Sequence, residues 1–171
     1  MAIKKSGRKN LNRMMQTGPF VAIAVIAERV LMEEGNHVPS LIRIVDRLLL
    51  PKEAVPFPKE GDNLAIPLTA FFGIRGGKFS GECEMSLYQI SPLGERDQAG
   101  DPVKLEFPRD TPDAGFNFQV PVILKWHGEG QYWFEVQLDK IPFCHVSLYV
   151  AIGKFPPTKK ATFQATKEQK S

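Results

Sequence analysis

Cysteine and histidine are scarce in this sequence. Cys83 and Cys144 are the only cysteines among 171 residues. They cannot build the disulfide framework of a small secreted domain, and no Cys-x-x-Cys pair suggests a structural zinc site. The three histidines, His37, His127 and His145, would need carboxylates beside them to form a metal or nucleophilic site. We expect a protein of a reducing compartment that holds no metal and no cofactor.

Long apolar runs are also missing. The stretch at residues 20–27 is interrupted by Glu28 and Arg29, whereas a membrane span needs about 20 apolar residues. The basic start of the chain is followed by polar residues such as Asn10 and Asn12 rather than by the apolar core of a secretory signal. We therefore expect a cytoplasmic protein without membrane association.

Catalytic motifs are absent as well. No nucleophile elbow, zinc-protease motif or phosphate loop occurs, and residues 75–78 (Arg-Gly-Gly-Lys) predict a hairpin turn. Cys144 and His145 are neighbours on a predicted strand, so their side chains leave opposite faces. Glu82 and Glu84 share one face at a spacing that could suit acid–base chemistry, although alternating glutamates are typical of a solvated strand. We expect no enzymatic activity.

Two acidic loops offer a calcium alternative. Glu53, Glu60 and Asp62 lie in one loop, and Glu95, Asp97 and Asp101 lie in another. Carboxylates from such loops could gather Ca²⁺ between strands. Their spacing is irregular and basic residues interrupt them, which favours ordinary solvated loops.

The small net charge of +3 conceals an uneven distribution. Residues 1–18 contain five basic and no acidic side chains, and residues 154–171 contain five basic and one acidic. Residues 19–153 contain 12 basic and 18 acidic side chains. We therefore predict an acidic domain over residues 19–153 between two disordered basic arms. The side chains that could contact an anion or nucleic acid are Lys4, Lys5, Arg8, Lys9, Arg13, Lys159 and Lys160.

Residues 19–153 show period-two alternation and short apolar runs, with Gly and Pro between them. Pro39 marks an edge strand or a bulge, and residues 51–62 and 91–102 are predicted loops. No segment is long enough for a crossover helix. The pattern predicts an all-β fold, an antiparallel β-sandwich of about eight strands. The expected strands cover residues 20–32, 38–46, 64–75, 81–90, 103–107, 116–126, 131–138 and 144–152.

Aromatic side chains on predicted outward faces are the main candidates for a binding surface. Trp133 alternates with glutamines and a glutamate, and Tyr149 shares a face with His145. His127 lies in the turn before the Trp133 strand. Such side chains are either covered by another part of the chain or offered to a partner. We predict a partner surface that contains Trp133, Tyr149, His127 and His145.

Three strand patterns carry a family resemblance. Residues 20–30 (FVAIAVIAERV) and 40–46 (SLIRIVD) open the domain, and a Gly-x-Tyr-x-Phe-x-Val strand at residues 130–136 lies near its end. Together they resemble a family of small bacterial proteins known only as a domain of unknown function. The resemblance implies an immunoglobulin-like or C2-like sandwich over about residues 19–152, and it brings no catalytic residues.

These observations favour a non-catalytic module that binds another protein, through an outward aromatic face or by strand addition at an exposed edge. Assembly with further copies of the same chain is one form of this. Two alternatives remain open. One is association with nucleic acid or an anionic surface through the basic arms. The other is carbohydrate or small-ligand binding at the sandwich loops, or a hydrolase that uses Glu82, Glu84 and His127.

Overall fold

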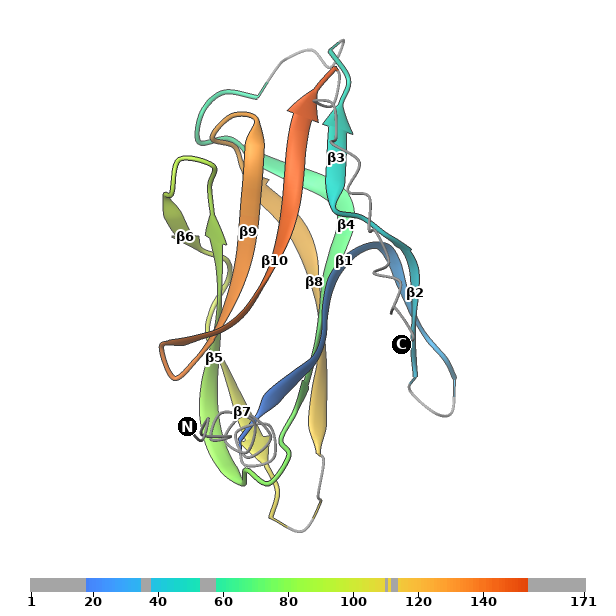
Figure 1. The fold of residues 1–171 in the computed structure, drawn as a ribbon, viewed down its shortest axis with the longest axis vertical. Helices are drawn as coiled ribbons and strands as arrows, with labels where there is room; N and C mark the ends of the chain where they lie inside the picture. The colour runs from blue at the N-terminus through green and yellow to red at the C-terminus, as the bar shows by residue number, and fades with distance from the viewer. Residues whose placement is uncertain (1–17, 35–37, 53–57, 110, 112–113, 154–171) are drawn as a thin grey trace, which may run out of the picture.

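A computed structural model describes residues 18–34, 38–52, 58–109, 111 and 114–153. The described residues form ten strands joined by turns and loops (Figure 1). The strands are β1 (Phe20–Met32), β2 (Pro39–Ile44), β3 (Arg47–Leu50), β4 (Asn63–Arg75), β5 (Gly81–Ile90), β6 (Arg96–Gln98), β7 (Val103–Phe107), β8 (Gly115–Lys125), β9 (Gly130–Leu138) and β10 (Ile141–Ile152).

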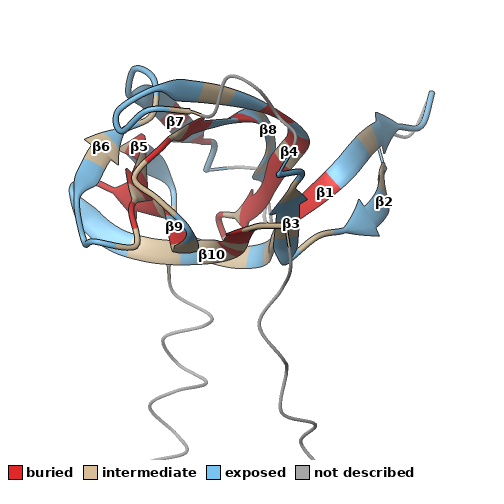
Figure 2. Cartoon of the chain, turned by 90° about the horizontal axis from the view of Figure 1, so that it is seen from above, coloured by how far each residue is buried: buried red, intermediate tan, exposed pale blue. Residues whose placement is uncertain are grey.

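Two sheets pack face to face. One has the strand order β2-β1-β4-β8, and the other has the order β3-β10-β9-β5-β6, with β7 also paired to β5. Seen from above, the buried segments of both sheets line the space between them (Figure 2). The predicted all-β sandwich is therefore confirmed, as is the place of Pro39 in an edge strand.

The structure contains two short strands that the sequence pattern did not reveal. β3 has four residues and β6 has three, too few for an alternating pattern to show. β3 pairs with the end of β10 in parallel, so that sheet is mixed rather than purely antiparallel. β6 pairs with the end of β5 inside the predicted loop at residues 91–102.

The core lies where the predicted inward faces meet. Ala70, Phe72 and Ile74 of β4 face Tyr132 and Val136 of β9, and all five are at most 1% exposed. This burial of alternate residues confirms the period-two predictions for both strands. At one end of the sandwich, three aromatic rings cover the core and contact one another edge to face. Phe107 of β7 lies 5.6 Å from Phe79 and 5.0 Å from Phe116 of β8, measured between ring centroids.

The outer half of β1 leaves the sandwich with β2 as a two-stranded arm (Figure 2). β1 pairs with β4 only as far as Ala27, and beyond that point it pairs with β2 alone. Leu31, Ile42 and Ile44 of this arm are 51%, 43% and 61% exposed. An isolated two-stranded ribbon buries little apolar surface, which explains their exposure.

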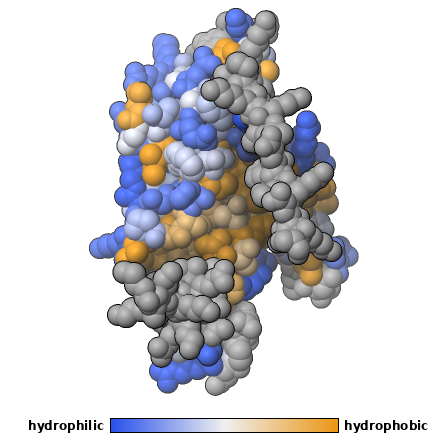
Figure 3. Space-filling view, in the orientation of Figure 1, coloured by the Kyte–Doolittle hydropathy of each residue, from blue (hydrophilic) through white to orange (hydrophobic). Residues whose placement is uncertain are grey.

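Within the part of the chain that the structure describes, the sandwich is open along two sides. β8 forms one edge of its sheet. On the other side, β2 pairs with β1 only from Ala27 onward, and β3 pairs with β10 only from Tyr149 onward. Apolar side chains gather between β10 and β1 in Figure 3, and Ala24, Cys144 and Val146 there are half-buried members of the core.

The two basic arms lie outside the described residues.

None of the residues that the structure describes forms a helix long and apolar enough to cross a membrane.

Candidate functional site

Two of the predicted aromatic residues meet on the outer face of the β9–β10 pair. The rings of Trp133 and His145 lie 4.9 Å apart between centroids and nearly perpendicular, at 83°. Tyr149 follows on the same face of β10, opposite Gln131. Trp133 is 37% exposed, so this part of the predicted surface is accessible.

The neighbouring polar groups on this face are paired with one another. The guanidinium of Arg96, on β6, lies 3.7 Å from the ring centroid of Tyr88. Its Nη2 also contacts Glu135 Oε1 at 2.7 Å. Sequence reasoning missed Tyr88 and Arg96 because β6 was assigned to a loop. The signal available was a tyrosine on the outward face of the β5 pattern.

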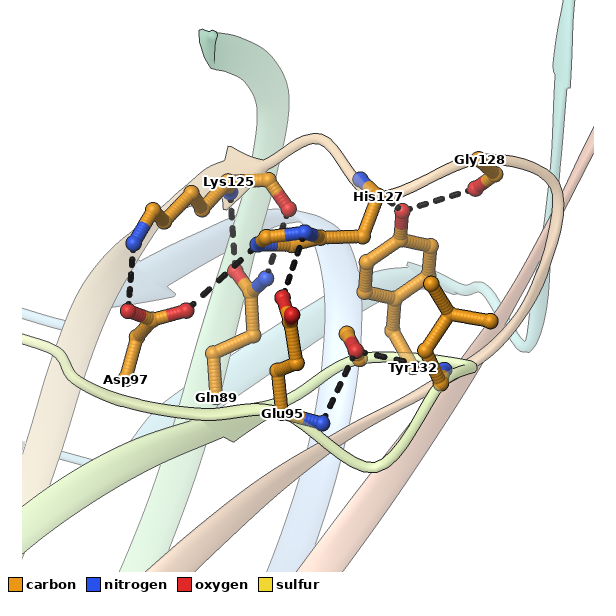
Figure 4. A network of polar contacts seen from close by, with 9 residues as sticks. Gln89, Glu95, Asp97, Lys125, His127, Gly128 and Tyr132 are labelled. Atoms are coloured by element: carbon orange, nitrogen blue, oxygen red, sulfur yellow. Dashed lines mark hydrogen bonds and ion pairs between the residues drawn. The ribbon is translucent and has the colours of Figure 1, made fainter. Parts of the chain in front are cut away.

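His127 does not reach this face. Its side chain is 7% exposed and lies under the loop before β6 (Figure 4). The Nδ1 atom is 2.7 Å from Glu95 Oε2, and Nε2 is 3.6 Å from Asp97 Oδ2. The prediction of an accessible His127 is therefore wrong, because the loop and β6 fold over the turn that carries it.

Tyr132 holds the turn that carries His127. Its hydroxyl donates a hydrogen bond to Gly128 O at 2.7 Å and accepts one from the His127 backbone N–H at 2.9 Å. The residue is fully buried. Burial raises the pKa of this phenol, and the hydrogen bond from His127 offsets part of that effect. The hydroxyl therefore stays a neutral donor at physiological pH.

A buried glutamine joins the two sheets at the end of β8. Gln89 of β5 is 3% exposed. Its Nε2 donates to Lys125 O at 2.8 Å, and its Oε1 accepts from the Lys125 backbone N–H at 3.0 Å (Figure 4). The amide thus pairs with Lys125 as the backbone of a neighbouring strand would. The Lys125 ammonium forms an ion pair with Asp97 Oδ1 at 2.5 Å. This contact holds β6 against the end of β8.

These contacts show which way the backbone of β8 faces. In an antiparallel strand the N–H and C=O of one residue point to the same side, and successive residues alternate. Lys125 turns its groups toward Gln89, whereas Trp126 bonds Gly61 and Asp62 on the β4 side. Alternate residues back along β8 therefore point away from β4. We call Asn117, Gln119, Pro121 and Ile123 the free edge of β8.

A cavity of about 500 Å³ opens beside the free edge. Its interior is apolar, with Ala70 and Val122 from one sheet and Leu87 and Phe134 from the other. Polar groups line the rest. The full lining is Gly61, Asn63, Ala70, Leu87, Gln89, Asp97, Gln98, Ala99, Gly100, Val120, Pro121, Val122, Ile123, Lys125 and Phe134.

The acidic residues considered as catalytic groups are not gathered in one place. Glu82 and Glu84 lie opposite β7, at the start of β5. His127 contacts the loop that follows the other end of β5. Ile90 lies eight positions after Glu82 along the strand, a distance of about 26 Å. A shared cleft for Glu82, Glu84 and His127 is therefore not formed.

In the first proposed calcium loop, Asp62 Oδ2 accepts a hydrogen bond from the Lys59 backbone N–H at 2.7 Å, and Glu53 lies outside the described residues. Glu95 and Asp97 face His127 and Lys125. Within the described residues, no group of three or more His, Cys, Asp or Glu side chains is placed to hold a metal ion.

Both cysteines are free thiols with suppressed reactivity. Burial raises the pKa of Cys83, and the charge of Asp139 adds to this effect. Burial also raises the pKa of Cys144 to about 11. At pH 7.5 only about one part in three thousand of Cys144 is then thiolate, the reactive form. We expect the folded chain to react with a thiol reagent much more slowly than the chain in denaturant, measured as the rate of thionitrobenzoate release. Equal rates would contradict this burial.

Comparison with known proteins leaves the family open. No family model matches the chain, and no curated protein matches it. Among solved structures it is similar to the alkylpurine DNA glycosylase AlkC of Pseudomonas fluorescens, bound to DNA that contains an abasic site analogue. That match has 7% identity and a TM-score of 0.40 and covers 85% of this chain, which spans only 34% of the glycosylase.

An immunoglobulin-like protein from Pseudomonas aeruginosa is similar at 16% identity and a TM-score of 0.32, with 80% of this chain and 98% of that chain covered. With identities and TM-scores this low, neither likeness bears on the activity of this chain. The resemblance to a bacterial family of unknown function stays a prediction.

Proposed function

We propose that this protein is a non-catalytic β-sandwich module that binds another protein, and that a segment of the partner adds as a strand to the free edge of β8. The observation that carries the proposal is the position of this edge beside the cavity between the sheets. Main-chain hydrogen bonds along such an edge supply affinity, and side-chain pockets beside it supply specificity.

The free edge of β8 has one of the usual protections against pairing, Pro121, but no charged side chain. Exposed edges are commonly blunted by charged side chains, by proline, or by short or distorted strands. β8 has 11 residues, and its free-edge positions carry no charge. Pro121 alone interrupts the row of N–H donors. Asn117, Gln119 and Ile123 remain able to donate and accept.

Two of the other edge strands, β2 and β6, are guarded. β2 has six residues, begins at Pro39 and contains Arg43 in a left-handed conformation at φ 54°. β6 has three residues, two of them the charged Arg96 and Asp97. A strand-adding partner is therefore better accommodated at β8 than at β2 or β6. The alternative of anion binding through the basic arms depends on residues outside the described part of the chain, and it stays a prediction.

The substitution Gln119→Pro tests strand addition. It removes an N–H that points away from β4, so pairing with β4 is retained, as it is at the natural Pro121. The probe is a set of peptides selected from a random display library on the full-length chain. We expect Gln119→Pro to weaken their binding by about tenfold or more, because a hydrogen bond is lost and the added strand is displaced.

Gln119→Ala is the matched control. It removes the same side chain but keeps the backbone donor, and we expect its affinity to stay within about twofold of the wild type. Both variants should unfold at nearly the same temperature as the wild type. Equal binding by the proline and alanine variants would overturn strand addition at this edge.

A further inference from the structure

We infer that the cavity beside β8 is a specificity pocket that takes one large, uncharged apolar side chain of the added strand. This rests on the proposed function and names the chemistry of the partner segment.

The pairing geometry of β8 directs a partner side chain into the cavity. In an antiparallel pair, residues directly opposite one another place their side chains on the same face of the sheet. Val120 and Val122 face the interior, and both line the cavity. A partner residue opposite either of them therefore points between the two sheets. Such a side chain approaches Leu87 and Phe134 of the facing sheet.

The chemistry of the lining favours an uncharged occupant. The interior of the cavity is formed by Ala70, Leu87, Val122 and Phe134, which are all buried and apolar. The two charged residues of the lining, Asp97 and Lys125, form an ion pair with each other. A charged partner side chain would lose its hydration there without gaining a free counter-charge. A leucine, methionine or aromatic side chain would exchange water for apolar contacts.

The pocket is held open before a partner arrives. Gln89 ties the end of β8 to β5, and the Lys125–Asp97 pair ties it to β6. The backbone N–H of Ala99 donates to Leu87 O at 2.8 Å, which fixes the segment after β6 as a wall of the cavity. Little ordering is needed on binding, and this lowers its entropic cost.

The outer face of β8 places a second requirement on the partner segment, beside the one set by the pocket. Ile123 belongs to the free edge and is 56% exposed. A partner residue opposite Ile123 would lie on the outer face, one position from the residue opposite Val122, which points into the pocket. We therefore expect the partner segment to carry two adjacent apolar residues, one directed inward and one directed against Ile123.

Filling the cavity tests the pocket. Val120→Phe and Ala99→Phe each place a ring in the cavity from a different wall, so one remains informative if the other does not fold. The probes are two synthetic versions of a library-selected peptide, one with its large apolar residue and one with alanine there. We expect the wild type to prefer the first by about tenfold to a hundredfold, and each filled variant to bind both peptides with nearly equal, weak affinity.

The outcomes separate the pocket from strand addition. If Gln119→Pro weakens binding but the filled variants keep the full preference for the large side chain, the pocket assignment is wrong and strand addition stands. If neither Gln119→Pro nor the cavity-filling substitutions alter peptide binding, both strand addition and the pocket assignment are wrong. Selected peptides that carry a charged residue where the large apolar one is expected would also overturn the pocket.

Discussion

Replacing Phe107 with alanine is expected to lower the free energy of unfolding by about 3–5 kcal/mol. Phe107 is 1% exposed and holds β7 against the opposite sheet through its edge-to-face contacts with Phe79 and Phe116. It also lies close to Gly76, where an added Cβ would come within 2.6 Å of its ring. The surrounding backbone is thus fitted to this side chain, and a cavity would remain after truncation.

Val103→Ala is the control for this change. Val103 lies on the same strand but is 44% exposed, so its truncation should cost less than about 1 kcal/mol. Urea unfolding followed by tryptophan fluorescence measures both variants. Similar losses for the two variants would show that the three rings do not close this end of the sandwich.

Replacing Gln89 with leucine should destabilise the protein by about 2–6 kcal/mol. The substitution keeps an apolar side chain of similar size but leaves the Lys125 N–H and C=O without their partner. Each buried backbone group that loses its hydrogen bond costs about 1–3 kcal/mol. In the same variant, the backbone amide of Lys125 should exchange its hydrogen faster than in the wild type, because it has lost its acceptor.

Gln98→Leu provides the matched comparison. Gln98 makes one side-chain hydrogen bond to Gly100 O and is exposed, so the same chemical change should cost less than about 1 kcal/mol. Urea denaturation of the two variants decides the matter. Equal stability for Gln89→Leu and Gln98→Leu would mean that the end of β8 is not tied to β5 by this amide.

The long strands could be predicted because their pattern repeats. On β4 and β9 every second residue is apolar, and most of these residues are buried, although Phe71 of β4 and Gln137 of β9, on the opposite faces, are buried as well. A period of two over nine or more residues specifies both the strand and its inward face. The sandwich class followed from several such strands without a helix between them.

The short strands and the polar contacts could not be predicted in the same way. β3 and β6 depend on the neighbours that pair with them, which no local pattern records. His127 looked exposed because its turn contains two glycines, but a loop more than 30 residues earlier covers it. Gln89 did leave a signal. It follows Cys83, Met85 and Leu87 on the inward face of β5, where a buried amide needs partners.

Residue-resolved hydrogen exchange of the full-length chain, with and without a library-selected peptide, tests strand addition most directly. In the free protein, the amides of Asn117, Gln119 and Ile123 should exchange rapidly, while those of Phe118 and Val120, which pair with Phe72 and Ala70, should be protected by β4. The bound peptide should slow exchange at the first three positions. Protection that appears instead along β1 and β10, around Trp133, or nowhere in β8 would contradict the proposal.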